Sequence, residues 1–192
     1  MKKDERVLLL LLVLGGLVFA NRQRIGSGAA RIATQASTGT TTMVRAAIEQ
    51  FRDMTLPRGV RNNNPGNLRI TTIAWKGKVP NAQNSDRSFE QFTEYQGIPG
   101  HIWGIRAMFK DIYGDIFKDG LNTVRKLIYS YAPPSENATH VYVDVVARAL
   151  GKSPDATITS ADLPKLVAAI IAHENSGYRY PDADIQKAMS LA

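Results

Sequence analysis

The sequence contains no cysteine, which excludes a disulfide framework, a thiolate metal site and a cysteine nucleophile. It also has no HExxH pair, no glycine-rich phosphate loop and no nucleophile elbow. Metal-dependent and nucleotide-dependent chemistry are therefore disfavoured, and no metal or cofactor is expected. With 192 residues, the chain has room for one ordinary domain plus attachments.

Acidic residues are scarce in the first third of the chain. Residues 1–61 hold ten Lys and Arg against four Asp and Glu, whereas residues 62–192 hold fourteen against thirteen. The basic excess therefore belongs to the N-terminal segment, and a domain that tracks nucleic-acid phosphates is disfavoured. A basic segment close to a membrane fits this distribution better.

The longest apolar run is Val7–Ala20, and it is short for a membrane span. Fourteen residues in a helix reach about 21 Å, against about 30 Å of hydrocarbon. One interpretation is an uncleaved anchor that relies on snorkelling of flanking arginines such as Arg22. The other is a secretory signal whose small residues, Val18 and Ala20, precede a cleavage site. Either way, residues 1–20 form the anchor or signal.

The remainder divides into a linker and one domain. Residues 21–43 are rich in Gly, Ser, Thr and Ala and contain no aromatic residue, which is typical of a linker. Residues 44–192 form the predicted globular domain. Within it, the Ile- and Thr-rich segment Leu68–Trp75 and the short segment Phe89–Phe92 predict two strands of a small hairpin.

Apolar residues at helical spacing predict the other elements. Ile102, Ile105, Phe109, Ile112 and Ile116 form one stripe. Thr123, Gly151 and Ser160 supply helix start and stop signals, and Val141, Val145 and Ala149 share one helix face. Helices are expected over residues 43–56, 102–116, 123–131, 139–150, 160–174 and 182–191. The expected fold is α+β and mainly α, with a small β-hairpin and a preceding N-terminal membrane helix.

Glu174 is the best candidate for a catalytic residue. It follows Leu163 by eleven residues, which is about 1100° of helical rotation, so it falls about 20° from the apolar stripe. A carboxyl group at the end of a buried stripe is partly withdrawn from water, which favours the protonated form and suits a general acid. The alternative is that Glu174 caps a neighbouring backbone group or pairs with Arg179.

Amide and aromatic side chains are the candidates for ligand binding. Paired amides suit sugar hydroxyl and acetamido groups, and aromatic rings can stack on sugar rings. The alternatives are a satisfied turn network for the amides and a core role for the rings. The candidate substrate-binding residues are Asn62, Asn63, Asn64, Asn67, Trp75, Tyr95 and Tyr178.

Other carboxylates are weaker candidates. Glu136 precedes a predicted helix, where a negative charge is favourable without any further role. Glu90 and Glu94 lie near the end of the second predicted strand, where either could face a groove as a second carboxylate or simply face solvent. Asp86 lies in a loop and has no distinguishing feature.

The segment from Arg58 to Arg69, RGVRNNNPGNLR, resembles a group of bacteriophage virion proteins. That group includes structural proteins of the P5 type and virion-associated muramidases. Further matching segments follow in order, and together they span nearly all of residues 57–192. They are Trp75–Gly77, Phe89–Phe92, Gly104–Met108, Ala132–Thr139 and His173–Asn175.

This resemblance implies a lysozyme-like domain in a phage particle that cleaves peptidoglycan during genome entry, with Glu174 as its acid. The helix end at Glu174 is similar to that of soluble lytic transglycosylases, although it comes late and no Gly-Leu-Met-Gln run follows. A permuted arrangement would place Asn62–Asn67 beside it in space. The implied location is the virion, membrane-associated through a single pass of Val7–Ala20, or the host cell envelope, with peptidoglycan and other virion proteins as partners. The alternative is a non-catalytic virion structural protein attached to the viral membrane.

Overall fold

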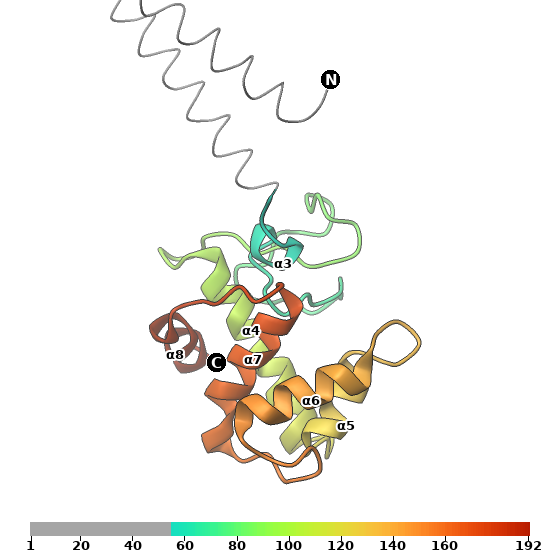
Figure 1. Ribbon diagram of the computed structural model, residues 1–192. Helices are drawn as coiled ribbons and strands as arrows, with labels where there is room; N and C mark the ends of the chain where they lie inside the picture. Colours follow the sequence, from blue (N-terminus) through green and yellow to red (C-terminus); the bar gives the residue numbers. More distant parts are fainter. Residues whose placement is uncertain (1–54) are drawn as a thin grey trace, which may run out of the picture. The chain divides into compact units, whose positions relative to one another are not determined.

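A computed structural model of the chain describes residues 55–192. The predicted membrane segment, the linker and the helix that begins at Met43 lie outside these residues. Between residues 55 and 192, no helix is long and apolar enough to cross a lipid bilayer. Figure 1 shows this part as helices joined by loops, with residues 62–99 forming a long irregular segment before the longest helix.

Six α-helices and one 3-10 helix make up the regular structure of residues 55–192. This mainly α architecture confirms the helical part of the predicted fold. The helices are α3 (Arg58–Arg61), α4 (Gly100–Phe117), α5 (Val124–Tyr131), α6 (Thr139–Leu150), the 3-10 helix η1 (Ser160–Asp162), α7 (Leu163–Glu174) and α8 (Asp182–Ser190).

Local sequence chemistry sets several helix ends. The Thr123 hydroxyl caps α5 by accepting a hydrogen bond from the backbone N–H of Lys126 at 3.3 Å. Gly151 ends α6 in the left-handed conformation, with φ of 67°. Pro164 lies in the first turn of α7, where its missing N–H leaves no intrahelical bond unmade. The predictions for Thr123 and Gly151 are confirmed, whereas Ser160 is the first residue of η1 rather than its N-cap.

The core lies where α7 packs against α4, α6 and α8. On α4 the predicted stripe is buried, since Ile105 and Ile112 are fully shielded from solvent. On α7 the buried face carries Leu166, Val167 and Ile170. Removal of these side chains from water is the main favourable contribution to folding.

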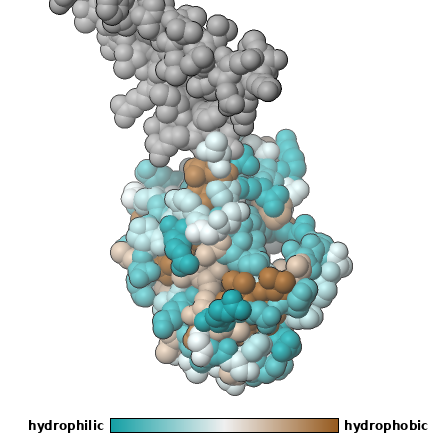
Figure 2. Space-filling view, in the orientation of Figure 1, coloured by the Kyte–Doolittle hydropathy of each residue, from teal (hydrophilic) through white to brown (hydrophobic). Residues whose placement is uncertain are grey.

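The predicted face of α6 turns outward. Val141 and Val145 are 46% and 38% exposed, and the buried side of the helix carries Tyr142, Val146 and Ala147 instead. Figure 2 shows hydrophobic surface over this part of the molecule. The spacing correctly places Val141 and Val145 on one face of α6. Because α6 carries apolar residues on two sides, the spacing does not reveal which side packs against the core.

The predicted β-hairpin is wrong in its extent. No regular strand forms among residues 55–192, and the segments 68–75 and 89–92 take part only in isolated antiparallel bridges. The two bridges here join Arg69 to Phe89 and Lys78 to Phe92. Polar side chains, rather than a continuous ladder of backbone hydrogen bonds between strands, bond many of the backbone N–H and C=O groups in this segment.

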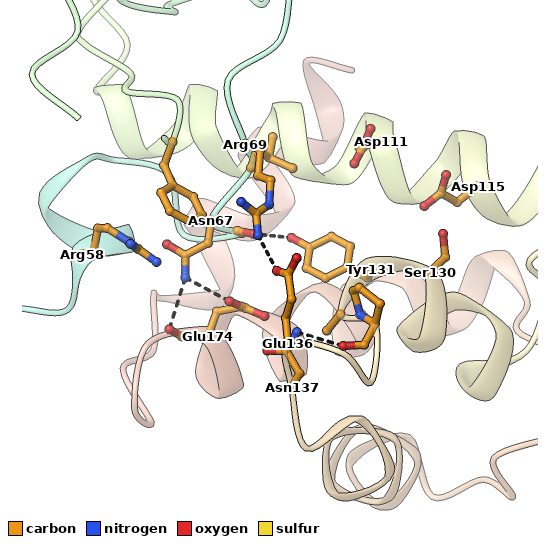
Figure 3. Close-up of a pocket in the computed structure, with 15 residues that line it drawn as sticks. Arg58, Asn67, Arg69, Asp111, Asp115, Ser130, Tyr131, Glu136, Asn137 and Glu174 are labelled. Carbon is orange, nitrogen blue, oxygen red and sulfur yellow. Dashed lines mark hydrogen bonds and ion pairs between the residues drawn. The ribbon is translucent and has the colours of Figure 1, made fainter. Parts of the chain in front are cut away.

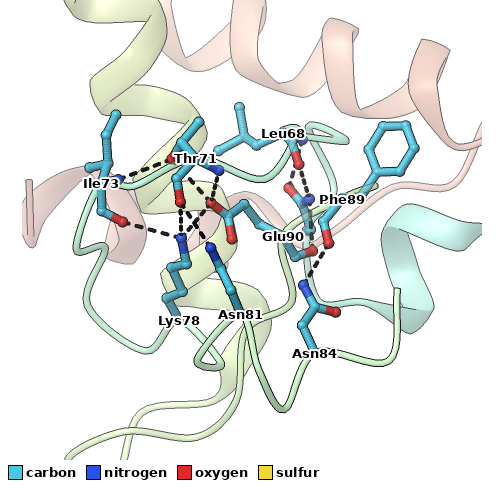
Figure 4. A network of polar contacts seen from close by, with 9 residues as sticks. Leu68, Thr71, Ile73, Lys78, Asn81, Asn84, Phe89 and Glu90 are labelled. Atoms are coloured by element: carbon cyan, nitrogen blue, oxygen red, sulfur yellow. Dashed lines mark hydrogen bonds and ion pairs between the residues drawn. The ribbon is translucent and has the colours of Figure 1, made fainter. Parts of the chain in front are cut away.

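Glu90 is the centre of this polar network, which Figure 4 shows. Its side chain is fully buried and accepts hydrogen bonds from the backbone N–H and the hydroxyl of Thr71, at 2.9 and 3.1 Å. Lys78 Nζ pairs with the same carboxylate oxygen at 2.8 Å. Glu90 therefore holds the irregular segment together, and the idea that it faces a groove is wrong. Glu94 is exposed.

Candidate functional site

Glu174 is the last residue of α7 and lines an open groove of about 630 Å³. The groove lies between the irregular segment, α4, and the end of α5 with the loop that follows it (Figure 3). A cavity of this size is in the range of small-molecule binding sites. Glu174 is half-buried, which matches its predicted place at the end of the apolar stripe.

The loop of residues 62–67 lies directly beside the end of α7. Asn67 Nδ2 donates a hydrogen bond to Glu174 Oε2 at 2.9 Å. Asn175, which is buried, donates from its amide to the carbonyl oxygens of Pro65 at 2.7 Å and Ile171 at 2.8 Å. Two motifs more than a hundred residues apart therefore meet, as the permuted arrangement predicts.

Glycine at position 104 allows this loop to lie against α4. A Cβ atom there would collide with the carbonyl oxygen of Asn63, and it would come within 2.9 Å of the Asn63 carbonyl carbon and 3.1 Å of Pro65 Cδ. Because the loop backbone fills that space, α4 and α7 together fix the position of Asn67 and hence its contact with Glu174.

The other three asparagines of the loop hold structure rather than line the groove. Asn62 donates to Asp86 Oδ2 at 2.8 Å, and Asn63 donates to the carbonyl oxygen of Phe92 at 3.0 Å. Asn64 is fully buried, with its amide donating to two backbone carbonyls and its oxygen accepting from the Leu68 N–H. Of the four predicted amides, the structure brings only Asn67 to Glu174.

The three predicted aromatic residues lie away from the groove. Trp75 is partly buried against the core. Tyr95 is 44% exposed and packs edge-on against Trp103, whose indole N–H donates to the Tyr95 carbonyl oxygen at 3.1 Å. Tyr178 is exposed and meets Tyr180 edge-on. None of the three is among the side chains that line the groove with Glu174.

Glu174 has no cationic partner among residues 55–192. Arg179, the partner considered from the sequence, lines a separate groove between α6 and α7. The carboxylate therefore has the neutral groups Asn67 and Tyr142 beside it and faces the open groove. A ligand in the groove can therefore reach this carboxyl group directly.

Asp111 and Asp115 are groove carboxylates that sequence reasoning missed. They lie one turn apart on α4 and line the same groove as Glu174 (Figure 3). Burial raises the pKa of Asp111. Burial, followed by the negative charges of Asp111 and Asp119, raises the pKa of Asp115 to about 6. Their sequence signal was an acidic pair, four residues apart, directly beside the apolar stripe.

We expect Asp115→Asn to stabilise the domain at pH 7.5 and not at pH 4. Because the folded-state pKa is raised, the native state binds more protons than the unfolded chain between about pH 4 and pH 6, and stability falls as pH rises through that window. The variant should gain about 1 kcal/mol at pH 7.5, after discounting for solvent screening. Denaturant unfolding at both pH values measures this. Asp144→Asn, at an exposed position on α6, is the control and should change little at either pH.

Two tyrosines lie close to Glu174, and one of them, Tyr131, lines the groove. The Tyr131 hydroxyl donates to the carbonyl oxygen of Gly66, and burial, followed by the charges of Glu174, Asp111 and Asp115, raises its pKa. Tyr131 therefore stays a neutral donor. Tyr142 is buried beside Glu174 and stacks on His173, with ring centroids 3.6 Å apart. Burial, followed by the negative charge of Glu174, raises the pKa of Tyr142, so its neutral hydroxyl lies against the Glu174 side chain.

Metal ligation has no arrangement to support it between residues 55 and 192, because no three His, Asp or Glu side chains there are close enough to hold an ion. The groove instead offers carboxyl groups, an amide and a phenol. Such a set can bind polyhydroxylated ligands through hydrogen bonds and can exchange protons with them.

Comparison with known proteins places the chain among phage proteins. No family model matches the sequence. The chain is 31% identical over 133 residues to protein P5 of Pseudoalteromonas phage PM2, a match that covers 68% of this chain and 78% of that protein. The P5-type part of the sequence resemblance is thereby confirmed. The chain therefore belongs to the family of phage proteins that includes protein P5 of phage PM2.

Proposed function

We propose that this chain is a virion protein of a phage and that its globular domain binds and cleaves the glycan strand of peptidoglycan. Membership in the P5 family supports the phage part of the proposal. The groove supports the glycan part, because it is open, polar and lined by carboxyl and amide groups. A lysozyme-like architecture is the corresponding proposal for the mainly α fold.

The observation that carries the proposal is the setting of Glu174. Its carboxyl group lines the groove, accepts a hydrogen bond from neutral Asn67 and forms no ion pair among the described residues. A glycosidic bond needs a proton on its leaving oxygen as the bond breaks, and a positioned carboxyl group supplies it. An ion-paired or sealed carboxylate could not do so.

A lytic transglycosylase route needs the fewest protein groups. Glu174 would protonate the glycosidic oxygen while the bond from that oxygen to the anomeric carbon breaks. The 6-hydroxyl of the same sugar would then attack the anomeric carbon and return its proton to Glu174. Hydrolysis would instead need a second carboxylate to activate water or to act as nucleophile, and Asp111 and Asp115 are the groove residues with that chemistry.

A non-catalytic structural role in the virion is the second candidate, and the relationship to protein P5 favours it at least as strongly, since that name carries no activity. The Asn67–Glu174 hydrogen bond also fits a purely structural role, because it ties the loop to α7. In this case the groove would bind glycan or another virion protein without cleaving it. Attachment to a membrane through Val7–Ala20 remains a prediction in both cases.

Incubation of the purified full-length protein with bacterial sacculi distinguishes the two roles. We expect soluble fragments to be released and mass spectrometry to identify their ends. A 1,6-anhydro end indicates the transglycosylase route, and a reducing end indicates hydrolysis. Absence of soluble fragments, together with retention of the protein on sacculi, would establish the non-catalytic role.

A further inference from the structure

Charged side chains are unevenly distributed along the groove. Arg58 lies at one end and Arg69 lies next to it, nearer the middle of the groove (Figure 3); their guanidinium groups are 3.6 and 5.6 Å from the centroid of the Phe89 ring. Asp111 and Asp115 line the wall formed by α4. Figure 3 shows Arg58 and Asp115 at opposite ends of the groove, with Glu174 and Tyr131 between them. A long ligand in the groove therefore meets positive charge at one end and negative charge at the other.

The arginine end already holds a carboxylate. Glu136, from the loop between α5 and α6, pairs with Arg69 at 2.5 Å, although both side chains are more than half exposed. An ion pair this exposed contributes little to stability, so an external carboxylate can replace it at small cost. Glu136 thus shows where an anionic group of a ligand can lie against Arg69.

Arg58 makes no direct ion pair among the described residues, and the nearest charge interaction is with Asp86. Its guanidinium stacks on Phe89. Stacking restrains the planar group while leaving the N–H donors at its edge available, which is a favourable arrangement for binding a carboxylate. The two arginines together can bind one anionic group through several N–H donors.

Resting on the proposed function, we infer that the Arg58–Arg69 end of the groove binds a carboxylate carried by the peptidoglycan strand, so that the strand lies in one orientation across Glu174. The carboxylate belongs either to the lactyl ether of muramic acid or to an attached stem peptide. In the reverse orientation the carboxylate of the ligand would lie near Asp111 and Asp115. Repulsion between like charges disfavours that orientation.

Binding of defined oligosaccharides to a Glu174→Gln background, in which the ligand is not cleaved, tests the inference. The probes are neutral chitotetraose, a muramic-acid tetrasaccharide with free lactyl groups, and the same tetrasaccharide with stem peptides. We expect one or both anionic probes to bind about five- to tenfold more tightly than chitotetraose at low salt, with the advantage shrinking as salt rises. The stronger of the two identifies the source of the carboxylate.

Arg58→Gln combined with Arg69→Gln should remove the preference, so that this double variant binds the anionic probes no more tightly than it binds chitotetraose. Arg125→Gln combined with Arg148→Gln is the matched control for lost charge, because these exposed arginines lie on α5 and α6 outside the groove, and it should keep the preference. Melting temperatures of both double variants check that the fold is intact.

Two results would overturn the inference: equal binding of neutral and anionic probes, or a preference that survives in the Arg58 and Arg69 double variant. Either result overturns only the inference about the carboxylate, and the proposed function still stands if chitotetraose binds and sacculi are cleaved. The proposed function itself fails when none of the three probes binds and sacculi release nothing, so the two failures are distinguishable.

Discussion

The substitution Glu174→Gln is expected to reduce the release of soluble fragments from sacculi by at least a hundredfold. Glutamine has the shape of glutamate and keeps an oxygen that can accept the hydrogen bond from Asn67, but it cannot give or take the proton that glycosidic cleavage needs. General acid catalysis typically contributes about 10² to 10⁴ in rate. Fragment release, measured at equal concentrations of wild type and variant, gives the ratio directly.

Glu94→Gln is the matched control for this experiment. Glu94 is exposed and lies outside the groove, so the same chemical change there should leave fragment release within about twofold of wild type. Melting temperatures within a few degrees would show that both variants are folded. Equal release by wild type and Glu174→Gln would remove Glu174 from the chemistry, and Asp111→Asn would then test the next groove carboxylate.

Local signals predicted the helices well because each depends on near neighbours in the chain. The 3.6-residue spacing of Ile102, Ile105, Ile112 and Ile116 gives α4, and Gly151 marks the end of α6 because it adopts a positive φ at little cost. These features need no knowledge of the rest of the fold. They are therefore visible in a single sequence.

The hairpin was predicted wrongly because side chains replace the ladder. Asn64 donates to the carbonyl oxygens of Leu68 and Glu90, and Thr71 donates its N–H to the Glu90 carboxylate rather than to a partner strand. A pattern rich in Ile and Thr cannot reveal that a distant amide and a buried ion pair will take those backbone groups.

The sequence predicts only part of the site, because some of its residues are recognisable from local features and others depend on the tertiary fold. Glu174 stands out because its helical phase and its place at the end of a helix are local properties. Which asparagine reaches it is a tertiary property, since Asn64 and Asn67 are chemically identical and only the fold turns one inward and the other toward Glu174. Asp111 and Asp115 become groove residues only because α5 and the loop after it lie opposite α4.

Gly104→Ala should be the most destabilising small change in the domain. The added Cβ would collide with the carbonyl oxygen of Asn63, and that oxygen belongs to a backbone that buried Asn64 holds in place. Relief therefore requires the loop to move off α4. We expect the free energy of unfolding to fall by about 3 kcal/mol and the melting temperature by about 10 °C, measured by denaturant and thermal unfolding.

Gly114→Ala provides the matched control, because it makes the same substitution in the same helix. A Cβ at position 114 meets no atom within 4 Å, so only the higher helix propensity of alanine acts, and stability should rise by about 0.5 to 1 kcal/mol. Opposite signs for the two variants would show that the close approach of the loop, rather than helix propensity, controls position 104. Since the same loop carries Asn67, Gly104→Ala should also weaken the Asn67–Glu174 contact. Fragment release should therefore fall by more than the loss of folded protein alone explains. If the Gly104→Ala variant were as stable as wild type, the loop would not lie against α4.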